Sequence, residues 1–244
     1  MPFAQRIEWE ITSSCNLQCP HCNASKREDK DLSHDALRAL AHELGREKPE
    51  VVSLTGGEPT LHPMLPELAA ILKGHGVAVQ VITNGTGLSE TLAAKLARAG
   101  VHMVWVSLDG PESIHDSLRG AGGTFREALT ALGACKKAGL GTGIITTLVG
   151  ANVGAFAELS PTIRRARPDY WYVWLATPTD TSSRWITPSH MEGIGATLLR
   201  LKRHHRELII GDNIGYGGAL ERLRHQGAPH GPLSFAGCGA GREI

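Results

Sequence analysis

The chain has 244 residues and carries 25 Lys and Arg against 24 Asp and Glu, so its formal net charge at pH 7 is +1. This length suits one large α/β domain, and the balanced charge gives no net field to attract a phosphate backbone, so nucleic acid is not an expected partner. No stretch approaches the roughly 20 apolar residues that cross a bilayer, and no apolar signal region precedes the first apolar segment; we therefore expect a cytoplasmic protein without membrane contact, with reduced thiols.

Strand-like and helix-like patterns alternate along the chain. Apolar residues at 7, 9 and 11 alternate with glutamates, which is the period of a half-buried strand. Ser33 precedes a helical pattern of leucines that ends at Gly45, and Thr124 with Glu127 has the spacing of a capping box. The expected elements in chain order are strand 7–11, helix 33–45, strand 51–54, helix 65–73, strand 77–83, helix 89–100, strand 101–107, helix 124–139, strand 142–148, helix 155–165, strand 170–175 and helix 187–201.

Six strand-then-helix units in series predict a parallel sheet with helices outside it, because crossovers between parallel strands are nearly always right-handed. Six units fall short of the eight that close a barrel. We therefore expect a partial (β/α)6, TIM-like open barrel over residues 1–206. Residues 207–244 form the expected C-terminal extension, with a short apolar strand at 208–211 and a Gly-rich tail that contains Cys238.

Four motifs directly follow expected strands. Three cysteines follow the first strand, Gly-Gly-Glu-Pro the second, Thr-Asn-Gly the third and Ser-Leu-Asp-Gly the fourth. The loops after parallel strands form one rim, where ligands bind in such barrels. We therefore expect all four motifs on one face.

Cys15, Cys19 and Cys22 place three of the chain's five cysteines close together. Thiolates are soft ligands for iron–sulfur clusters and zinc, and a cube held by three cysteines leaves one iron free to take a small molecule. Two alternatives stay open. One is a structural zinc site with His21 or Cys238 as fourth ligand. Zinc sites usually have two short Cys/His ligand pairs separated by a longer stretch, and the second pair is missing here. The other is unliganded or disulfide-bonded cysteines.

Other residues of the expected rim suit a polar ligand. Gly56 and Gly57 lack a Cβ atom, so their backbone can approach a ligand closely, although two glycines also suit a plain turn. Ser107 and Asp109 could bond the hydroxyls of a ribose, or they could cap a turn. Arg119 has the planar fork that suits a carboxylate, and an ordinary solvated arginine is the alternative.

In this order, Cys-x-x-x-Cys-x-x-Cys, Gly-Gly-Glu-Pro and Ser-Leu-Asp-Gly resemble the motifs of the radical S-adenosylmethionine (radical SAM) enzymes, over nearly the whole chain. The resemblance implies a [4Fe–4S] cluster on Cys15, Cys19 and Cys22. The amino and carboxylate groups of S-adenosyl-L-methionine would lie on the fourth iron. Reduction of the cluster would cleave this cofactor and release a 5′-deoxyadenosyl radical, which abstracts a substrate hydrogen.

The same resemblance implies roles for further residues. The segment Gly56–Glu58 would hold the methionyl ammonium. Ser107, Asp109 and Asn84 would lie near the ribose, and Arg119 would lie near the carboxylate. No catalytic residue is predicted for the hydrogen transfer itself.

Two local features bear on the branch of the superfamily. His21 stands where its members often have an aromatic residue, and its ring could pack on adenine. The run from Asp109 to Phe125 resembles the branch with an auxiliary-cluster extension of the SPASM or twitch type. Cys238-Gly-Ala-Gly is similar to the first ligand of that extension, whose remaining cysteines are absent here.

Members of that branch commonly modify ribosomally made peptides by crosslinking, thioether formation or epimerisation. The resemblance therefore implies a peptide substrate, with reduced flavodoxin or ferredoxin as electron donor. A small-molecule cofactor precursor or an RNA base is the alternative substrate. The alternative to an enzyme is a zinc-stabilised α/β binding module.

Overall fold

The computed structural model describes residues 6–22, 31–178, 185–211 and 214. Its strands form one parallel sheet of seven strands in sequence order, with β1 and β7 at the two edges. The open parallel α/β fold is therefore confirmed. The strands are β1 (Arg6–Glu10), β2 (Val51–Thr55), β3 (Ala78–Thr83), β4 (Val101–Ser107), β5 (Gly141–Leu148), β6 (Tyr170–Leu175) and β7 (Leu208–Ile210).

The sheet has one strand more than the six units that the sequence predicts. The sequence places the apolar segment at 208–211 in the C-terminal extension, whereas Leu208 pairs in parallel with Trp171 of β6. The chain thus returns to the same sheet after its last described helix. The rest of the expected extension, including Cys238, lies outside the described residues, and a separate domain there stays a prediction.

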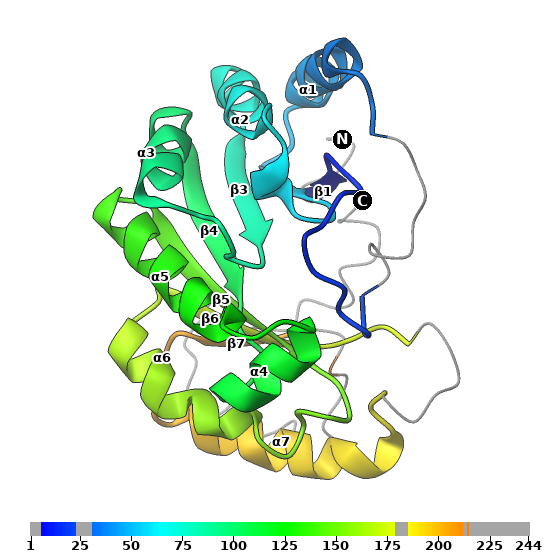
Figure 1. Cartoon of the computed structure of the whole chain (residues 1–244), viewed down its shortest axis with the longest axis vertical. Helices are drawn as coiled ribbons and strands as arrows, with labels where there is room; N and C mark the ends of the chain where they lie inside the picture. The colour runs from blue at the N-terminus through cyan, green and yellow to red at the C-terminus, as the bar shows by residue number, and fades with distance from the viewer. Residues whose placement is uncertain (1–5, 23–30, 179–184, 212–213, 215–244) are drawn as a thin grey trace.

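Helices cover the outer side of the curved sheet (Figure 1). Alternate strand residues point towards them, such as Val79 and Val81 on β3 and Val104 and Val106 on β4, all fully buried. The elements are α1 (His34–Glu47), η2 (Pro59–Leu61), α2 (Leu65–Gly74), α3 (Glu90–Arg98), α4 (Glu112–Arg119), α5 (Thr124–Lys137), η3 (Phe156–Leu159), α6 (Ser160–Ala166) and α7 (Pro188–Lys202).

Several helix ends differ from the expectation. Ser33 caps α1 as predicted, since its hydroxyl accepts a hydrogen bond from the Ala36 N–H. The helix continues past Gly45 to Glu47, however. A Cβ atom on Gly45 would lie 2.5 Å from the His75 ring, so this glycine serves close packing and does not end the helix. The helix predicted over 155–165 is split into η3 and α6, with Pro161 in the first turn of α6, where its missing N–H costs nothing.

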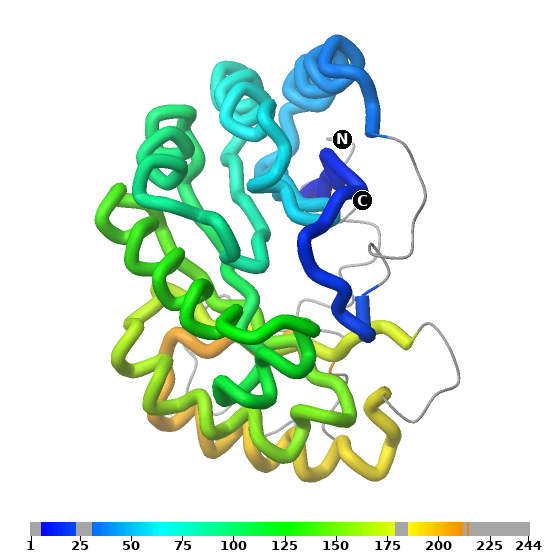
Figure 2. Tube along the Cα trace, viewed as in Figure 1, coloured from blue at the N-terminus to red at the C-terminus, as the bar shows by residue number. Residues whose placement is uncertain are grey.

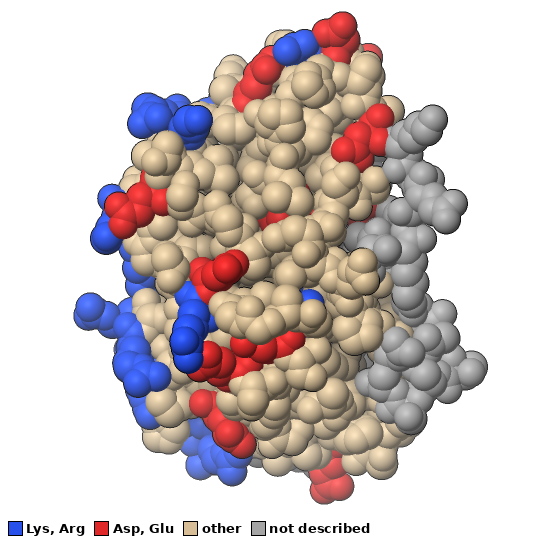
Figure 3. Space-filling view, viewed as in Figure 1, with Lys and Arg blue, Asp and Glu red and all other residues tan. Residues whose placement is uncertain are grey.

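Charged side chains are mixed in sign over the surface. Figure 3 shows Lys and Arg along the side where α3, α5 and α6 lie, interspersed with Asp and Glu rather than joined into one basic surface on this face. Within the described ranges, no helix combines the length and apolar character needed to span a bilayer.

Candidate active site at the carboxyl ends of the strands

Cys15, Cys19 and Cys22 lie on the loop that follows β1 and runs along the open side of the sheet (Figure 2). None of the three is in a disulfide; Cys19 is buried and the other two are half-buried. The loop is held by its own backbone, because the Cys22 N–H donates to the Cys19 carbonyl (3.1 Å) and the Leu17 N–H to Cys15 Sγ (3.4 Å). The three thiols are therefore available to a metal centre.

Burial raises the pKa of the thiols of Cys15 and Cys19. At Cys19 the nearby Arg119 guanidinium lowers the pKa in turn, whereas Cys22 raises the pKa of both thiols. The thiols thus oppose one another's ionisation. Since a bound cation favours the thiolate, this loop suits a positively charged metal centre.

The glycine turn after β2 packs directly on the start of the cysteine loop. The Gly57 N–H donates to the Thr12 carbonyl (2.7 Å), and the Glu58 N–H donates to the Ser14 carbonyl (2.8 Å). A Cβ atom on Gly56 would lie 2.3 Å from Thr12 O, and one on Gly57 would lie 2.2 Å from Ser14 O. Both positions require glycine, and the turn fixes where the cysteine loop begins.

Glu58 is buried and joins the turn after β2 to the end of β3. Its Oε1 accepts hydrogen bonds from the Thr60 N–H (3.0 Å), the Thr60 hydroxyl (2.6 Å) and the Thr83 hydroxyl (2.6 Å). Its Oε2 accepts from the Asn84 N–H (2.7 Å). Burial raises the pKa of this carboxyl, and the hydrogen bonds limit the increase. Both oxygens of the Glu58 carboxylate thus accept hydrogen bonds from other groups of the protein.

Asn84 connects β3 to the cysteine loop. Its Nδ2 donates to Asn16 Oδ1 (3.0 Å), and its Oδ1 accepts from the Thr86 N–H (2.8 Å) and hydroxyl (2.6 Å). Asn16 Nδ2 donates to the Thr86 hydroxyl (2.6 Å). The sequence analysis singles out neither Asn16 nor Thr86; the signal for Asn16 is its place inside the cysteine motif. The Asn84 side chain thus ties β3 to the cysteine loop with one of its two Nδ2 hydrogens, and its contact with a ribose stays a prediction.

Asp109 is completely buried and pairs with Arg119 of α4, at 2.6 Å between Oδ2 and Nη2. Its Oδ1 accepts from the Thr147 N–H (2.9 Å). Burial acts to raise the pKa of Asp109, but the Arg119 guanidinium and the other nearby donors hold it below its ordinary value. Both carboxylate oxygens therefore bind groups of the protein, and the ribose contact of Asp109 stays a prediction.

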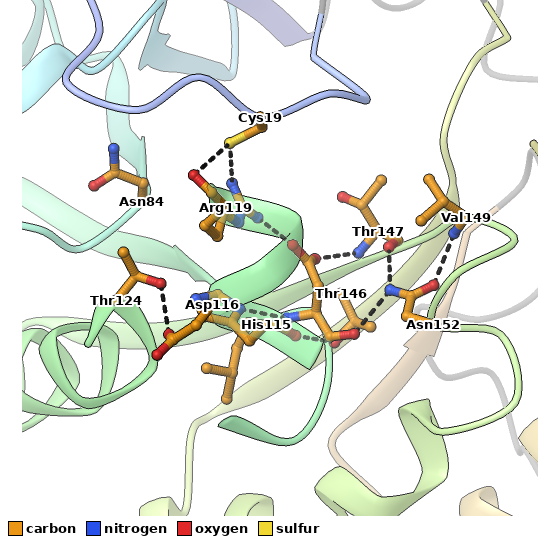
Figure 4. A network of polar contacts seen from close by, with 12 residues as sticks. Cys19, Asn84, His115, Asp116, Arg119, Thr124, Thr146, Thr147, Val149 and Asn152 are labelled. Atoms are coloured by element: carbon orange, nitrogen blue, oxygen red, sulfur yellow. Dashed lines mark hydrogen bonds and ion pairs between the residues drawn. The ribbon is translucent and has the colours of Figure 1, made fainter. Parts of the chain in front are cut away.

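Arg119 lies against the cysteine loop as well as against Asp109. Figure 4 shows its side chain beside Cys19, whose Sγ lies 4.0 Å from Nη1. The Cys19 thiol also lies 3.9 Å from the Arg119 carbonyl oxygen. Arg119 is buried, which excludes the alternative of an ordinary solvated arginine.

His115, also on α4, was not a candidate from the sequence. Its Nδ1 accepts a hydrogen bond from the Asp109 N–H (3.0 Å), so the neutral ring carries its proton on Nε2. Burial lowers the pKa of His115 to about 4. The ring is therefore neutral at pH 7.

Three buried polar atoms of this cluster have no hydrogen-bond partner in the described part of the chain: His21 Nδ1, His115 Nε2 and Arg119 Nε. Buried polar groups in folded proteins are nearly always paired, so this group marks a place for a polar ligand. Three cysteines that are not in a disulfide lie on the adjoining loop. The residues present therefore fit an iron–sulfur cluster with a polar cofactor beside it.

Ser107 ends β4 and is half-buried. Its hydroxyl forms no hydrogen bond with any described residue. The Ser107 hydroxyl is therefore available to a ribose, as the sequence predicts.

The described side chains do not form a site for a single metal ion. Among residues 6–22, 31–178, 185–211 and 214, no three His, Cys, Asp or Glu side chains are close enough to hold one metal ion. A zinc ion needs all its ligands at about 2.0–2.3 Å, whereas an iron–sulfur cube distributes its thiolates over separate irons. Cys238, the distant candidate for a zinc ligand, is outside these ranges.

Comparisons with known proteins agree with this geometry. The model of the Radical SAM superfamily matches residues 9–160. The chain is 37% identical over 150 residues to Fe-coproporphyrin III synthase of Methanosarcina barkeri (60% of this chain, 38% of that protein). It is 30% identical over 243 residues to the mycofactocin maturase MftC of Mycolicibacterium smegmatis (98% of this chain, 60% of that protein).

Solved structures share the fold. Streptococcus suis SuiB, bound to S-adenosylmethionine or to precursor peptide SuiA, matches with a TM-score of 0.73 in both cases at 16% identity. The matches cover 86% and 90% of this chain, and 50% and 52% of the SuiB chain. The chain thus spans 38% to 60% of the length of the two curated relatives and about half of SuiB.

The matched family region covers more than half of the chain and begins within β1, directly before the three cysteines. The chain therefore belongs to the radical SAM superfamily, whose members are enzymes that bind a [4Fe–4S] cluster and S-adenosyl-L-methionine.

Proposed function

We propose that Cys15, Cys19 and Cys22 hold a [4Fe–4S] cluster and that the chain removes a hydrogen atom from a ribosomally synthesised peptide, leading to a crosslink, a thioether or an epimerised residue. When bound, the reduced cluster and S-adenosyl-L-methionine would supply a 5′-deoxyadenosyl radical as the hydrogen abstractor. One observation carries the proposal: three cysteines that are not in a disulfide adjoin three buried polar atoms that have no partner among the described residues.

The chain's own residues would bind and orient the cofactor. The carbonyl oxygens of Gly56 and Gly57 can accept from the methionyl ammonium, whereas the N–H groups of Gly57 and of the next residue are occupied. The Ser107 hydroxyl would bond the ribose, and Arg119 Nε–H would donate to the carboxylate. Burial lowers the pKa of His21, so its neutral ring can pack on adenine at pH 7.

Glu58, Asn84 and Asp109 would position the loops around the cofactor. Glu58 joins the ends of β2 and β3, and Asn84 joins β3 to the cysteine loop. Asp109 holds the Arg119 guanidinium. Since each of these side chains contacts other groups of the protein, they would fix the distances between the groups that bind the cofactor.

The activity is tested by the release of 5′-deoxyadenosine from S-adenosyl-L-methionine. Anaerobically reconstituted protein should release it after reduction with dithionite, and then with reduced flavodoxin or ferredoxin as the proposed natural donor. Cys19→Ala should abolish the release, and Cys135→Ala should not, because Cys135 is buried on α5 and outside the cysteine loop. Release by Cys19→Ala at the wild-type rate would overturn the proposal.

A peptide substrate is supported by the relatives. The match to the mycofactocin maturase MftC runs along 98% of this chain, and the structurally similar SuiB is seen with a precursor peptide. Short peptides encoded near the same locus should therefore change in mass on incubation with the reduced enzyme and S-adenosyl-L-methionine, as read by mass spectrometry.

A tetrapyrrole is the second candidate substrate, because Fe-coproporphyrin III synthase is the more identical of the two relatives, at 37%. The discriminating measurement offers the peptides and, in parallel, iron tetrapyrroles that are precursors of Fe-coproporphyrin III, the compound that this relative is named for making. A peptide substrate predicts 5′-deoxyadenosine release stimulated by the peptides, and a tetrapyrrole substrate predicts stimulation by a tetrapyrrole precursor. Membership in an enzyme superfamily leaves a non-enzymatic zinc module without support.

A further inference from the structure

The buried ion pair of Asp109 and Arg119 presents its positive partner to a proposed cluster ligand. Arg119 Nη2 lies 2.6 Å from Asp109 Oδ2, and Nη1 lies 4.0 Å from Cys19 Sγ. Asp109 is 0% exposed and Arg119 is 9% exposed, so solvent and salt screen these charges weakly. A buried pair is weak evidence of a purely stabilising role, because well-packed apolar residues often serve stability as well.

We propose that the Asp109–Arg119 pair sets the reduction potential of the cluster that Cys19 helps to hold. The inference rests on the proposed function, since it requires the cluster. One-electron reduction adds one negative charge to the cluster, and a positive charge beside a sulfur ligand stabilises the reduced form. Arg119 thus raises the potential, while Asp109 moderates this effect and fixes the guanidinium in place.

Of the two contacts that Arg119 makes with Cys19, only the guanidinium contact can persist when Cys19 is a ligand. As a thiol, Cys19 can donate to the Arg119 carbonyl oxygen, at 3.9 Å, but a thiolate has no proton to donate. The guanidinium contact persists in both forms, because a thiolate accepts hydrogen bonds. Arg119 contacts the Cys19 sulfur directly through Nη1 and holds Asp109 through Nη2, so the positive charge should act on this sulfur more strongly than the negative one.

Opposite charge changes should shift the potential in opposite directions. Arg119→Gln leaves Asp109 unpaired, so the potential should fall. Asp109→Asn leaves Arg119 uncompensated, so the potential should rise. Each change should alter the ratio of reduced to oxidised cluster at a fixed potential by roughly tenfold, which is about 59 mV for one electron.

Two further variants keep the inference testable if a variant with one unpaired buried charge fails to fold. Arg119→Lys keeps the charge and should remain near the wild-type potential. The double variant Asp109→Asn/Arg119→Gln removes both charges, and its potential should lie between those of the wild type and Arg119→Gln, because the lost positive charge acts more strongly on Cys19. Arg126→Gln is the matched surface control; its side chain is 78% exposed and pairs with Glu112.

The measurement is an EPR-monitored redox titration of the anaerobically reconstituted full chain without S-adenosyl-L-methionine. Potentials that decrease in the order Asp109→Asn, wild type, double variant, Arg119→Gln would support the inference, with Arg126→Gln equal to the wild type. If Arg119→Gln and Asp109→Asn bind no cluster, the inference is tested by comparing Arg119→Lys with the double variant. Equal potentials for these two variants would overturn the inference.

The outcome also separates the two proposals. Equal potentials in variants that hold a cluster would overturn the inference and leave cluster binding intact. A reconstituted wild-type chain without iron and sulfide would overturn the proposed function, and the inference would fall with it.

Discussion

Gly57 shows how little space separates the turn after β2 from the cysteine loop. The sequence explains the two glycines by close approach to a ligand, whereas in the structure the nearest neighbour is the backbone of residues 12–14. A sequence pattern identifies where the backbone must come close, but it does not identify what it comes close to. The turn therefore acts on the cysteines through the loop that it supports.

We expect Gly57→Ala to lower the free energy of unfolding by about 1–3 kcal/mol, because its Cβ would lie 2.2 Å from the Ser14 carbonyl. The matched control is Gly133→Ala on α5, where a Cβ atom meets nothing within 4 Å. A helix-interior alanine there should stabilise the protein by up to about 1 kcal/mol. Denaturant unfolding of both variants tests this, and equal changes would contradict the steric reason.

His115 should make the protein sensitive to acid. Burial lowers its pKa from 6.5 to about 4, so the unfolded chain takes up a proton that the folded chain excludes. Stability should therefore fall as the pH decreases from about 6.5 to about 4, by at most about 3 kcal/mol. Asp109, whose pKa is lowered from 3.8, contributes only at lower pH.

The measurement compares unfolding free energies at pH 7 and pH 5 for the wild type and His115→Asn. The variant should lose less stability on acidification than the wild type. The comparison with a variant is needed because burial also raises the pKa of Glu58. A raised carboxyl pKa makes the folded state more stable as the pH falls, which opposes the effect of His115. The exposed His204→Asn is the control, and a wild-type acid response in His115→Asn would refute the assignment.

Helix α4 is the element that the sequence analysis missed, and it carries His115 and Arg119. Its signals are present: Pro111 precedes it, Glu112 lies in its first turn and Gly120 follows its last residue in the left-handed conformation. The helix has only eight residues, so its apolar period is too short to stand out. The motif-based prediction therefore recognised Arg119 and Asp109 but assigned no role to the buried His115.

The start of α5 shows a second local error. The predicted capping box between Thr124 and Glu127 is absent, because Gly123 is the N-cap and has no side chain. Asp116 of α4 replaces it: Oδ1 accepts from the Phe125 N–H (2.8 Å) and the Thr124 hydroxyl (2.8 Å), and Oδ2 accepts from the Gly123 N–H (2.7 Å). A cap supplied by a neighbouring helix is a tertiary contact, which spacing within α5 cannot predict.

Asp116→Ala should therefore destabilise the protein by about 0.5–2 kcal/mol, the usual cost of losing a helix cap. Glu127→Ala tests the alternative, since a real capping box would make it destabilising, whereas the structure predicts a change close to zero for this exposed side chain. Thermal or denaturant unfolding of the two variants decides between them.

For the molecule as a whole, the sequence predicts the parallel order of the strands and the gathering of the motifs at one end. Both follow from alternating patterns and from right-handed crossovers. The pairing of β7 with β6 was not predicted, because a strand of three residues does not reveal its neighbour. The ion pair of Asp109 with Arg119 and the hydrogen bond of Asn84 with Asn16 were also not predicted, since both depend on side chains from other parts of the chain.

The central claim is that the three cysteines after β1 hold the cluster together. It is tested most directly by the iron and sulfide content and the EPR signal of anaerobically reconstituted, dithionite-reduced single variants. The control is Cys135→Ala, whose buried thiol has a pKa raised to about 12. We predict about four irons and four sulfides, with a reduced-cluster signal, in the wild type and Cys135→Ala, and loss of both in Cys15→Ala, Cys19→Ala and Cys22→Ala. Full cluster content in any of these three variants would contradict the account.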